Sequence, residues 1–163
     1  MRVLSTDWPP AASTRRLWLR IALLLAVLLL TVQWAFMATT ISGNSMSPTL
    51  RDGQMALVFT QAYRFSPPQR GDLVVVSTEK DFLVKRVIGL PGDNVAIHDS
   101  KTFVNGAQLD EPYLKLNGRW QVDEGRLGPS RYAIVGDNRS GAQGSSLLAV
   151  VSRDRILGKL VYY

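Results

Sequence analysis

The sequence contains no cysteine and only one histidine, His98. Without cysteine there can be no disulfide, no thiolate metal site and no cysteine nucleophile. A single histidine also makes a histidine-rich metal centre or a Ser-His-Asp triad hard to build, so hydrolytic chemistry in this chain needs another base. We expect neither a metal nor a cofactor.

Charged residues are missing between Ile21 and Leu50. Residues 21–38 have Gln33 as their only strongly polar side chain, and continuing the run to residue 41 gives about 20 residues, enough to cross a bilayer core of about 30 Å as a helix. A cleaved secretory signal and a buried core helix are the alternatives. Because bulky residues such as Trp34 and Phe36 interrupt the small-residue pattern of a cleavage site, a retained anchor is favoured.

The arginines at the start of the chain predict its orientation. Arg15, Arg16 and Arg20 precede the apolar run, and no Lys or Arg follows it before Arg51. The positive-inside rule then places the N-terminus in the cytoplasm. The predicted organisation is a cytoplasmic tail at 1–20, a transmembrane anchor at 21–41 and an extracytoplasmic domain at 42–163.

The net charge of +6 invites a nucleic-acid hypothesis, but half of it lies in the predicted cytoplasmic tail. Four arginines and one aspartate lie in the first twenty residues, so the rest of the chain carries only +3. We therefore expect no nucleic-acid partner. A net charge of +3 still allows a basic face of this part of the chain to contact anionic membrane lipid.

After the anchor, runs rich in β-branched and aromatic residues alternate with turn residues, and no stretch has sustained helical periodicity. Asn105-Gly106 is a strong hairpin signal, and residues 117–130 are expected to form a long surface loop or hairpin. These patterns predict one mainly β domain of about 120 residues. Its expected strands are 55–60, 72–77, 82–88, 94–98, 102–104, 131–135 and 156–163.

Two residues are candidates for hydrolytic chemistry. Ser45 follows Gly43 in a segment that can turn sharply and expose a hydroxyl. Lys85 lies in an apolar strand, where alternation puts it on one face with Leu83 and Val87. Burial would lower its pKa from about 10.4 toward the range of about 7–8 that suits a general base. A Ser-Lys dyad would remove the need for a catalytic histidine.

Each of these residues also has an ordinary structural interpretation. A serine in a loop is usually a turn or cap residue, and a lysine in a strand is usually exposed at its tip. His98, beside Asp99, is typical of a solvated loop. The catalytic interpretation of Ser45 and Lys85 is favoured because the two residues occur together, in a particular order and sequence context.

Four motifs in order, behind an N-terminal span, give the chain a specific resemblance. The sequence resembles bacterial type I signal peptidases, membrane-anchored Ser-Lys endopeptidases. The motifs are Gly43-Asn44-Ser45-Met46-Ser47-Pro48-Thr49-Leu50, Arg70-Gly71-Asp72-Leu73-Val74, Lys85-Arg86-Val87-Ile88-Gly89-Leu90-Pro91-Gly92-Asp93, and Gly136-Asp137-Asn138-Arg139 with Gly158-Lys159.

The resemblance implies a mainly β catalytic fold, Ser45 as nucleophile and Lys85 as base. It implies a substrate bound as an extended strand, with small residues preferred at −1 and −3. Met46 and Leu50 would line the −1 pocket, and Leu83 and Val84 would contact the substrate strand. The partners would be exported preproteins carrying signal peptides, and the location would be the bacterial inner membrane.

The chain departs from the family pattern in two places. The serine that orients the base in the family falls on Ala142, and Ser140, Ser145 or Ser146 are the candidates to replace it. Some members also place an oxyanion-binding serine two residues before the nucleophile. Here that position is Gly43, whose backbone N–H could serve with that of Ser45.

These departures keep a second hypothesis open. The protein would then be a specialised or catalytically weak relative of signal peptidases, acting on few substrates or as an assembly partner. A third hypothesis, from a different class, is a tethered β binding module with a fortuitous dyad. Cleavage of a standard preprotein distinguishes the first hypothesis from both.

Overall fold

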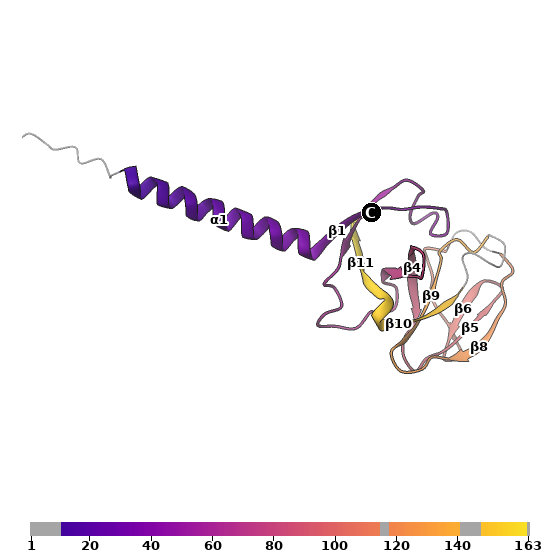
Figure 1. Cartoon of the computed structure of the whole chain (residues 1–163). Coiled ribbons are helices and arrows are strands. Elements are labelled where there is room, and N and C mark those ends of the chain that lie inside the picture. Colours follow the sequence, from indigo (N-terminus) through magenta and orange to yellow (C-terminus); the bar gives the residue numbers. More distant parts are fainter. Residues whose placement is uncertain (1–10, 115–117, 141–147, 163) are drawn as a thin grey trace, which may run out of the picture. The chain divides into compact units, whose positions relative to one another are not determined.

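The computed structural model describes residues 11–114, 118–140 and 148–162. The chain divides into two compact units, Met1–Ala35 and Phe36–Tyr163. The described part of the first unit is helical, and the second unit contains the strands (Figure 1).

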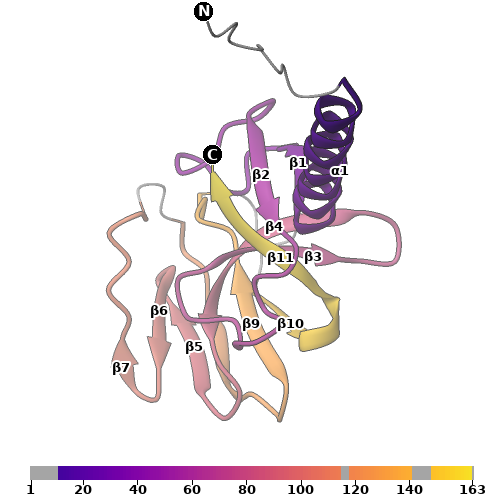
Figure 2. The same cartoon turned by 90° about the vertical axis from the view of Figure 1, so that its left-hand side faces the viewer.

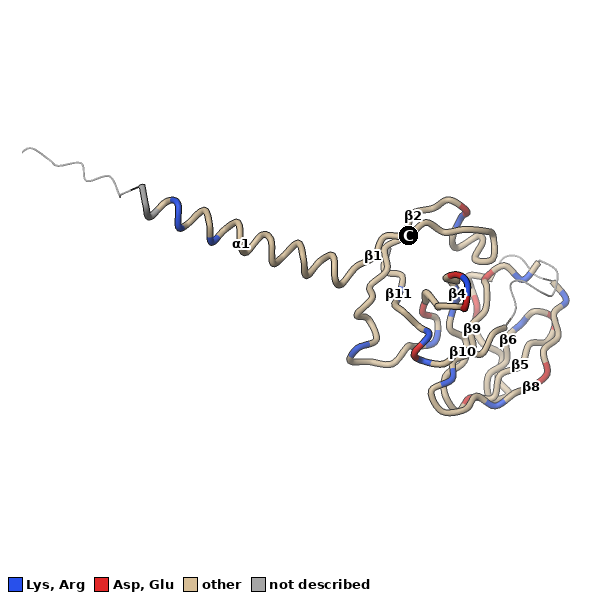
Figure 3. The backbone as a smooth tube through the Cα atoms, viewed as in Figure 1, with Lys and Arg blue, Asp and Glu red and all other residues tan. Residues whose placement is uncertain are grey.

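The first unit is built around α1 (Ala11–Ala35). Leucine and alanine, both strong helix formers, dominate α1, and the helix contains neither proline nor glycine. Its segment Thr14–Ala35 has 22 residues and a mean hydropathy of 2.0, which makes it long and apolar enough to cross a membrane. Its basic residues lie only near the N-terminal end (Figure 3).

The helix ends six residues earlier than the expected anchor at 21–41. Phe36–Thr40 form strand β1, which pairs antiparallel with β2 (Met55–Phe59) in the second unit. The rings of Phe36 and Phe59 stack with their centroids 5.1 Å apart. Aromatic and β-branched residues favour a strand once a partner is available, and an apolar run alone does not separate a helix from a strand.

The larger sheet has seven strands in the order β1-β2-β11-β3-β4-β9-β10, all antiparallel to their neighbours. Figure 2 shows β11 running between β2 and β3. The last strand, β11, lies inside the sheet between β2 and β3, and the first strand, β1, pairs with β2. Strand pairing therefore holds both the start and the end of the β unit. The remaining strands are β3 (Leu73–Ser77), β4 (Phe82–Gly89), β9 (Arg131–Val135), β10 (Ala149–Ser152) and β11 (Ile156–Tyr162).

The smaller sheet has the order β7-β6-β5-β8. Its hairpin between β6 and β7 turns at Asn105 and Gly106, with φ angles of 52° and 80°. Two successive positive φ angles match the predicted hairpin turn, so this prediction is confirmed. The strands are β5 (Asn94–His98), β6 (Lys101–Val104), β7 (Ala107–Gln108) and β8 (Val122–Arg126).

Each of the seven expected strands overlaps an observed strand closely, and the mainly β fold class is confirmed. The expected loop at 117–130 contains β8, whose charged sequence VDEGR gives little strand signal. Strands β1, β7 and β10 were not expected either. They are short edge strands, in which tertiary pairing decides the conformation more than local composition does.

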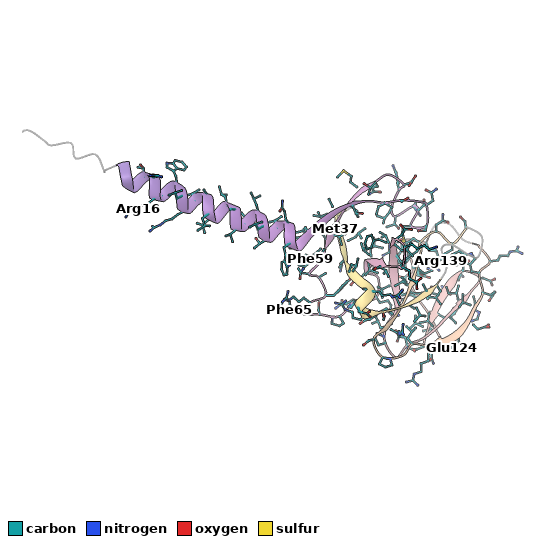
Figure 4. All side chains as sticks on the ribbon, viewed as in Figure 1. Arg16, Met37, Phe59, Phe65, Glu124 and Arg139 are labelled. Carbon is teal, nitrogen blue, oxygen red and sulfur yellow. The ribbon has the colours of Figure 1, made fainter. Side chains whose placement is uncertain are left out.

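The two sheets are joined by a buried arginine. Arg139 has no exposed surface, and its guanidinium donates to Ser100 O at 2.7 Å and to Glu111 Oε1 at 2.7 Å. It lies within the β unit in Figure 4. A buried cation with a carboxylate partner holds Ser100, just before β6, and Glu111, after β7, against the segment after β9.

Candidate active site

Ser45 lies in the loop between β1 and β2. The base of this loop is closed by main-chain hydrogen bonds from Ile41 N–H to Gln54 O, at 2.8 Å, and from Gly53 N–H to Ile41 O, at 2.9 Å. Inside it, Gly43 has φ of +84°, which glycine adopts without strain. Ser45 is partly exposed, so its hydroxyl is within reach of a substrate.

Lys85 lies on β4 opposite Val74 of β3, and only 4% of its surface is exposed. Burial lowers the pKa of the Lys85 ammonium below its usual value, because the charged form loses its hydration. The negative charge of Asp137 acts in the opposite direction but does not cancel the effect of burial. The predicted burial of Lys85 is therefore confirmed.

Ser45 and Lys85 meet at Gly136. A Cβ atom placed on Gly136 would lie 2.4 Å from the carbonyl oxygen of Ser45 and 3.4 Å from Lys85 Nζ. Since 2.4 Å is far inside van der Waals contact, a side chain at residue 136 would push the nucleophile loop away from the segment after β9. The glycine lets these two segments approach one another, with the Lys85 amine beside them.

A buried ion pair holds the neighbouring elements together. Asp137 is fully buried and receives hydrogen bonds from Arg86 Nε at 2.8 Å and from the second terminal nitrogen of Arg86 at 2.6 Å. Thr49 Oγ1 donates to the same carboxylate at 2.6 Å. The Arg86 guanidinium also lies 3.8 Å from the centre of the Tyr113 ring. One carboxylate thus ties the nucleophile loop, β4 and the segment after β9.

A narrow cleft opens beside Ser45, with a volume of about 90 Å³. Strand β9 pairs with β4 only from Arg86 onward, so within the described residues the second edge of Phe82–Lys85 has no strand partner. Three residues of this stretch, Phe82, Leu83 and Val84, line the cleft. The lining residues are Thr39, Thr40, Ile41, Ser42, Ser45, Met46, Val75, Phe82, Leu83 and Val84.

Three of the four residues expected to contact substrate line the cleft, and the fourth does not. Met46, Leu83 and Val84 line the cleft. Leu50 does not belong to its lining; it is fully buried in the core with Val58 and neighbouring apolar residues.

The expected oxyanion donor Gly43 is already engaged. Its N–H donates to Asp52 Oδ1 at 2.8 Å, so this bond must break before the N–H can bind an oxyanion. Among the candidates to orient the base, Ser140 is exposed and its hydroxyl donates to Asn138 Oδ1 at 2.6 Å. Ser145 and Ser146, with Ala142, lie outside the described residues.

The sequence did not reveal Asp137 as the shared partner of Arg86 and Thr49. The available signal was an aspartate directly after the apolar strand 131–135, since a carboxylate entering a core needs a partner. It also missed the cleft wall at 39–42, because residues up to 41 were assigned to the membrane anchor. Within the described residues, no group of three His, Asp or Glu side chains is placed to hold a metal ion.

Comparison with known proteins identifies relatives over most of the chain. A family model described as "Signal peptidase, peptidase S26" matches residues 14–163. The chain is 33% identical to signal peptidase IB of Staphylococcus aureus over 163 residues, covering 87% of this chain and 85% of the relative. It is 32% identical to the probable signal peptidase I-2 of Synechocystis over 130 residues, covering 75% of this chain and 60% of the relative.

A solved structure is also similar. The crystal structure of a signal peptidase I from Enterococcus faecalis matches with a TM-score of 0.47 and 25% identity, covering 59% of this chain and 98% of that one.

Proposed function

This chain belongs to the signal peptidase family, peptidase S26, and we propose that it removes signal peptides from exported preproteins with Ser45 as nucleophile and Lys85 as general base. The observation that carries the proposal is that Lys85 Nζ and the Ser45 carbonyl both lie beside Gly136, next to a narrow cleft. Lys85 is buried there and its pKa is lowered. Burial that disfavours the charged form of the amine is what a lysine base needs to take a proton from a hydroxyl.

In the proposed reaction the neutral Lys85 amine accepts the Ser45 Oγ proton as the oxygen attacks the scissile carbonyl carbon. The tetrahedral intermediate then collapses, the C–N bond breaks, and the Lys85 ammonium gives its proton to the leaving amine. This leaves the signal peptide as an ester on Ser45. Lys85 next takes a proton from water, whose oxygen attacks the ester carbonyl carbon. As the bond from that carbon to Ser45 Oγ breaks, Lys85 returns the proton to Ser45 Oγ, and the signal peptide leaves as a carboxylic acid.

The open edge of β4 supports binding of the substrate as an added strand. Main-chain groups at Phe82–Val84 are available on that edge, and the end of β1 forms the opposite wall. Met46 and Val84 stand in the core-facing part of the cleft, where both also pack against buried residues. A space of about 90 Å³ with packed walls favours small side chains at −1 and −3, because bulky ones would meet atoms that cannot move.

Of the two oxyanion donors expected from the sequence, Gly43 and Ser45, only Ser45 is kept. Because Asp52 holds the Gly43 N–H, we assign the main donor role to the N–H of Ser45 itself. The tetrahedral oxygen would thus be stabilised from the same residue that attacks. Fixed donors of this kind stabilise the transition state without reorganising during the reaction.

We propose that α1 anchors the protein in the bacterial inner membrane, with the N-terminus in the cytoplasm and the unit Phe36–Tyr163 on the outer side. The arginines before the apolar part of α1 support this orientation. The substrate's own hydrophobic segment would lie in the same membrane, so anchoring brings the enzyme and the cleavage site to the same surface.

The test is cleavage of a preprotein by the purified full chain in detergent, with the product termini identified by mass spectrometry. We expect one cut after a small residue at −1, and loss of that cut when −1 is changed from Ala to Leu. Cutting at many unrelated sites, or equal cutting by Ser45→Ala, would contradict the proposal.

A further inference from the structure

We propose that Asn138 is a positioning residue that fixes the peptide bond between Asn44 and Ser45, and with it the direction of the Ser45 N–H that binds the oxyanion. This inference rests on the proposed function. It starts from the hydrogen bonds that Asn138 makes on both sides of its side-chain amide.

The orientation of the Asn138 amide is set by its partners. Its Nδ2 donates to the carbonyl oxygen of Asn44 at 3.0 Å. Its Oδ1 accepts from the N–H of Ser140 at 3.0 Å and from the Ser140 hydroxyl at 2.6 Å. A flipped amide would set oxygen against oxygen at Asn44 and an NH₂ group against an N–H at Ser140, so only one orientation satisfies every partner.

The bond to Asn44 controls a neighbouring N–H because both groups belong to one peptide plane. The peptide bond between Asn44 and Ser45 is trans, whereas the bond between Ser47 and Pro48 is cis. In a trans peptide the carbonyl of Asn44 and the N–H of Ser45 point to opposite sides of the same planar unit. While Asn138 holds the carbonyl, the Ser45 N–H must point away from Asn138. The Asn44 carbonyl also accepts from the N–H of Ser47 at 3.1 Å, so rotation of the plane would break both bonds, and only the one from Asn138 comes from outside the loop.

The next peptide bond is held from the same residue. The backbone N–H of Asn138 donates to the carbonyl oxygen of Ser45 at 3.0 Å. Asn138 therefore donates hydrogen bonds to the carbonyl groups before and after the Ser45 Cα atom. Donation to the Asn44 carbonyl also polarises that peptide group and strengthens its N–H as a donor.

The variant Asn138→Asp tests the role with little change in shape. It puts a carboxylate oxygen against the Asn44 carbonyl and keeps the acceptor that faces Ser140. Loss of a whole oxyanion donor costs about 10²–10³ in kcat elsewhere, and a loosened donor costs less, so we expect a fall of about 10- to 100-fold in kcat with KM within about two-fold. Assays on the alkaline plateau limit any effect of the new charge on Lys85, and the uncharged variant Asn138→Ala should fall similarly.

A thioamide substrate separates oxyanion binding from simple loss of structure. Sulfur at the scissile carbonyl is a poorer hydrogen-bond acceptor than oxygen, so the wild-type enzyme should cleave the amide much faster than the thioamide. If the Ser45 N–H is misdirected, the amide loses more than the thioamide does. We expect the amide-to-thioamide rate ratio to fall by about the same factor as kcat.

Asn105→Asp is the matched control. The Asn105 amide also uses both its atoms, donating to Asp93 Oδ1 and accepting from the N–H of Asn94, but it lies in the smaller sheet. This change should lower thermal stability and leave the rate ratio unaltered. An unchanged ratio in a slower Asn138→Asp enzyme, an unchanged kcat, or unfolding of both Asn138 variants would overturn the positioning role. Failure of the wild-type enzyme to cleave preprotein would instead overturn the proposed function.

Discussion

At Lys85 two electrostatic effects act on one amine in opposite directions. Burial removes water from the ammonium and lowers its pKa, while the carboxylate of Asp137 favours the charged form. The larger effect is burial, which is also what makes the residue useful as a base. The same carboxylate is occupied by Arg86 and Thr49, so it acts on Lys85 from a distance rather than as an ion-pair partner.

The dyad predicts non-additive losses. Ser45→Ala and Lys85→Ala should each remove nearly all cleavage, and the double variant should lose little more, because the two residues act as one unit. The measurement is kcat/KM on a preprotein-derived peptide for the four enzymes. Losses that multiply in the double variant would show that the two residues act independently.

The pH profile follows from the lowered pKa of Lys85. Protonated lysine cannot accept the serine proton, so activity should rise with pH and level off once the amine is neutral. The midpoint of the rise should lie well below the usual lysine pKa of about 10.4. A rate that does not change from acidic to alkaline pH, with chemistry rate-limiting, would argue against a lysine base. Lys85→Arg should be inactive throughout, since guanidinium stays charged.

At the scale of elements, three segments far apart in sequence are joined through one buried carboxylate. The nucleophile loop supplies Thr49, β4 supplies Arg86, and the segment after β9 supplies Asp137. Strand β4 therefore carries both the base and the residue that ties its surroundings together. The geometry of the site depends on pairing between elements, not on the nucleophile loop alone.

This arrangement predicts a large stability loss for Asp137→Ala. The change removes the carboxylate that neutralises the buried Arg86 cation, and breaking a buried ion pair in this way typically costs about 3–5 kcal/mol in unfolding free energy. Thr49→Val removes only one hydrogen bond to the carboxylate and should cost about 1–3 kcal/mol. Urea unfolding of the full chain in detergent measures both. Equal losses for the two variants would mean that the ion pair contributes nothing beyond the hydroxyl bond.

The sequence was enough to predict the central strands, because the alternation of residues indicates a strand at 82–88. The order of the motifs was enough to propose Ser45 and Lys85 as the dyad. The sequence was not sufficient at 36–40, where the same apolar residues suit a membrane helix or a strand and the partner β2 decides. Nor could it show that Gly43 donates to Asp52, because that bond depends on how the loop closes at Ile41. Local patterns predict elements, whereas contacts between loops need the fold.

For the whole molecule, the absence of cysteine makes topology directly measurable. Any single cysteine introduced into this chain is the only reactive thiol. Thr39 lies on β1 and lines the cleft, whereas Leu28 lies within the apolar part of α1. The two positions differ by eleven residues but belong to different units of the structure.

We therefore predict that Thr39→Cys reacts with a membrane-impermeant maleimide added to intact spheroplasts, because β1 belongs to the β unit, which we propose lies outside the membrane. Leu28→Cys should stay unlabelled until the membrane is dissolved in denaturant. Thr14→Cys, before the arginines, should react only after the membrane is permeabilised. Labelling of Thr14→Cys but not Thr39→Cys in intact cells would reverse the orientation, and protection of both Thr39→Cys and Leu28→Cys would return residues 36–41 to the membrane span.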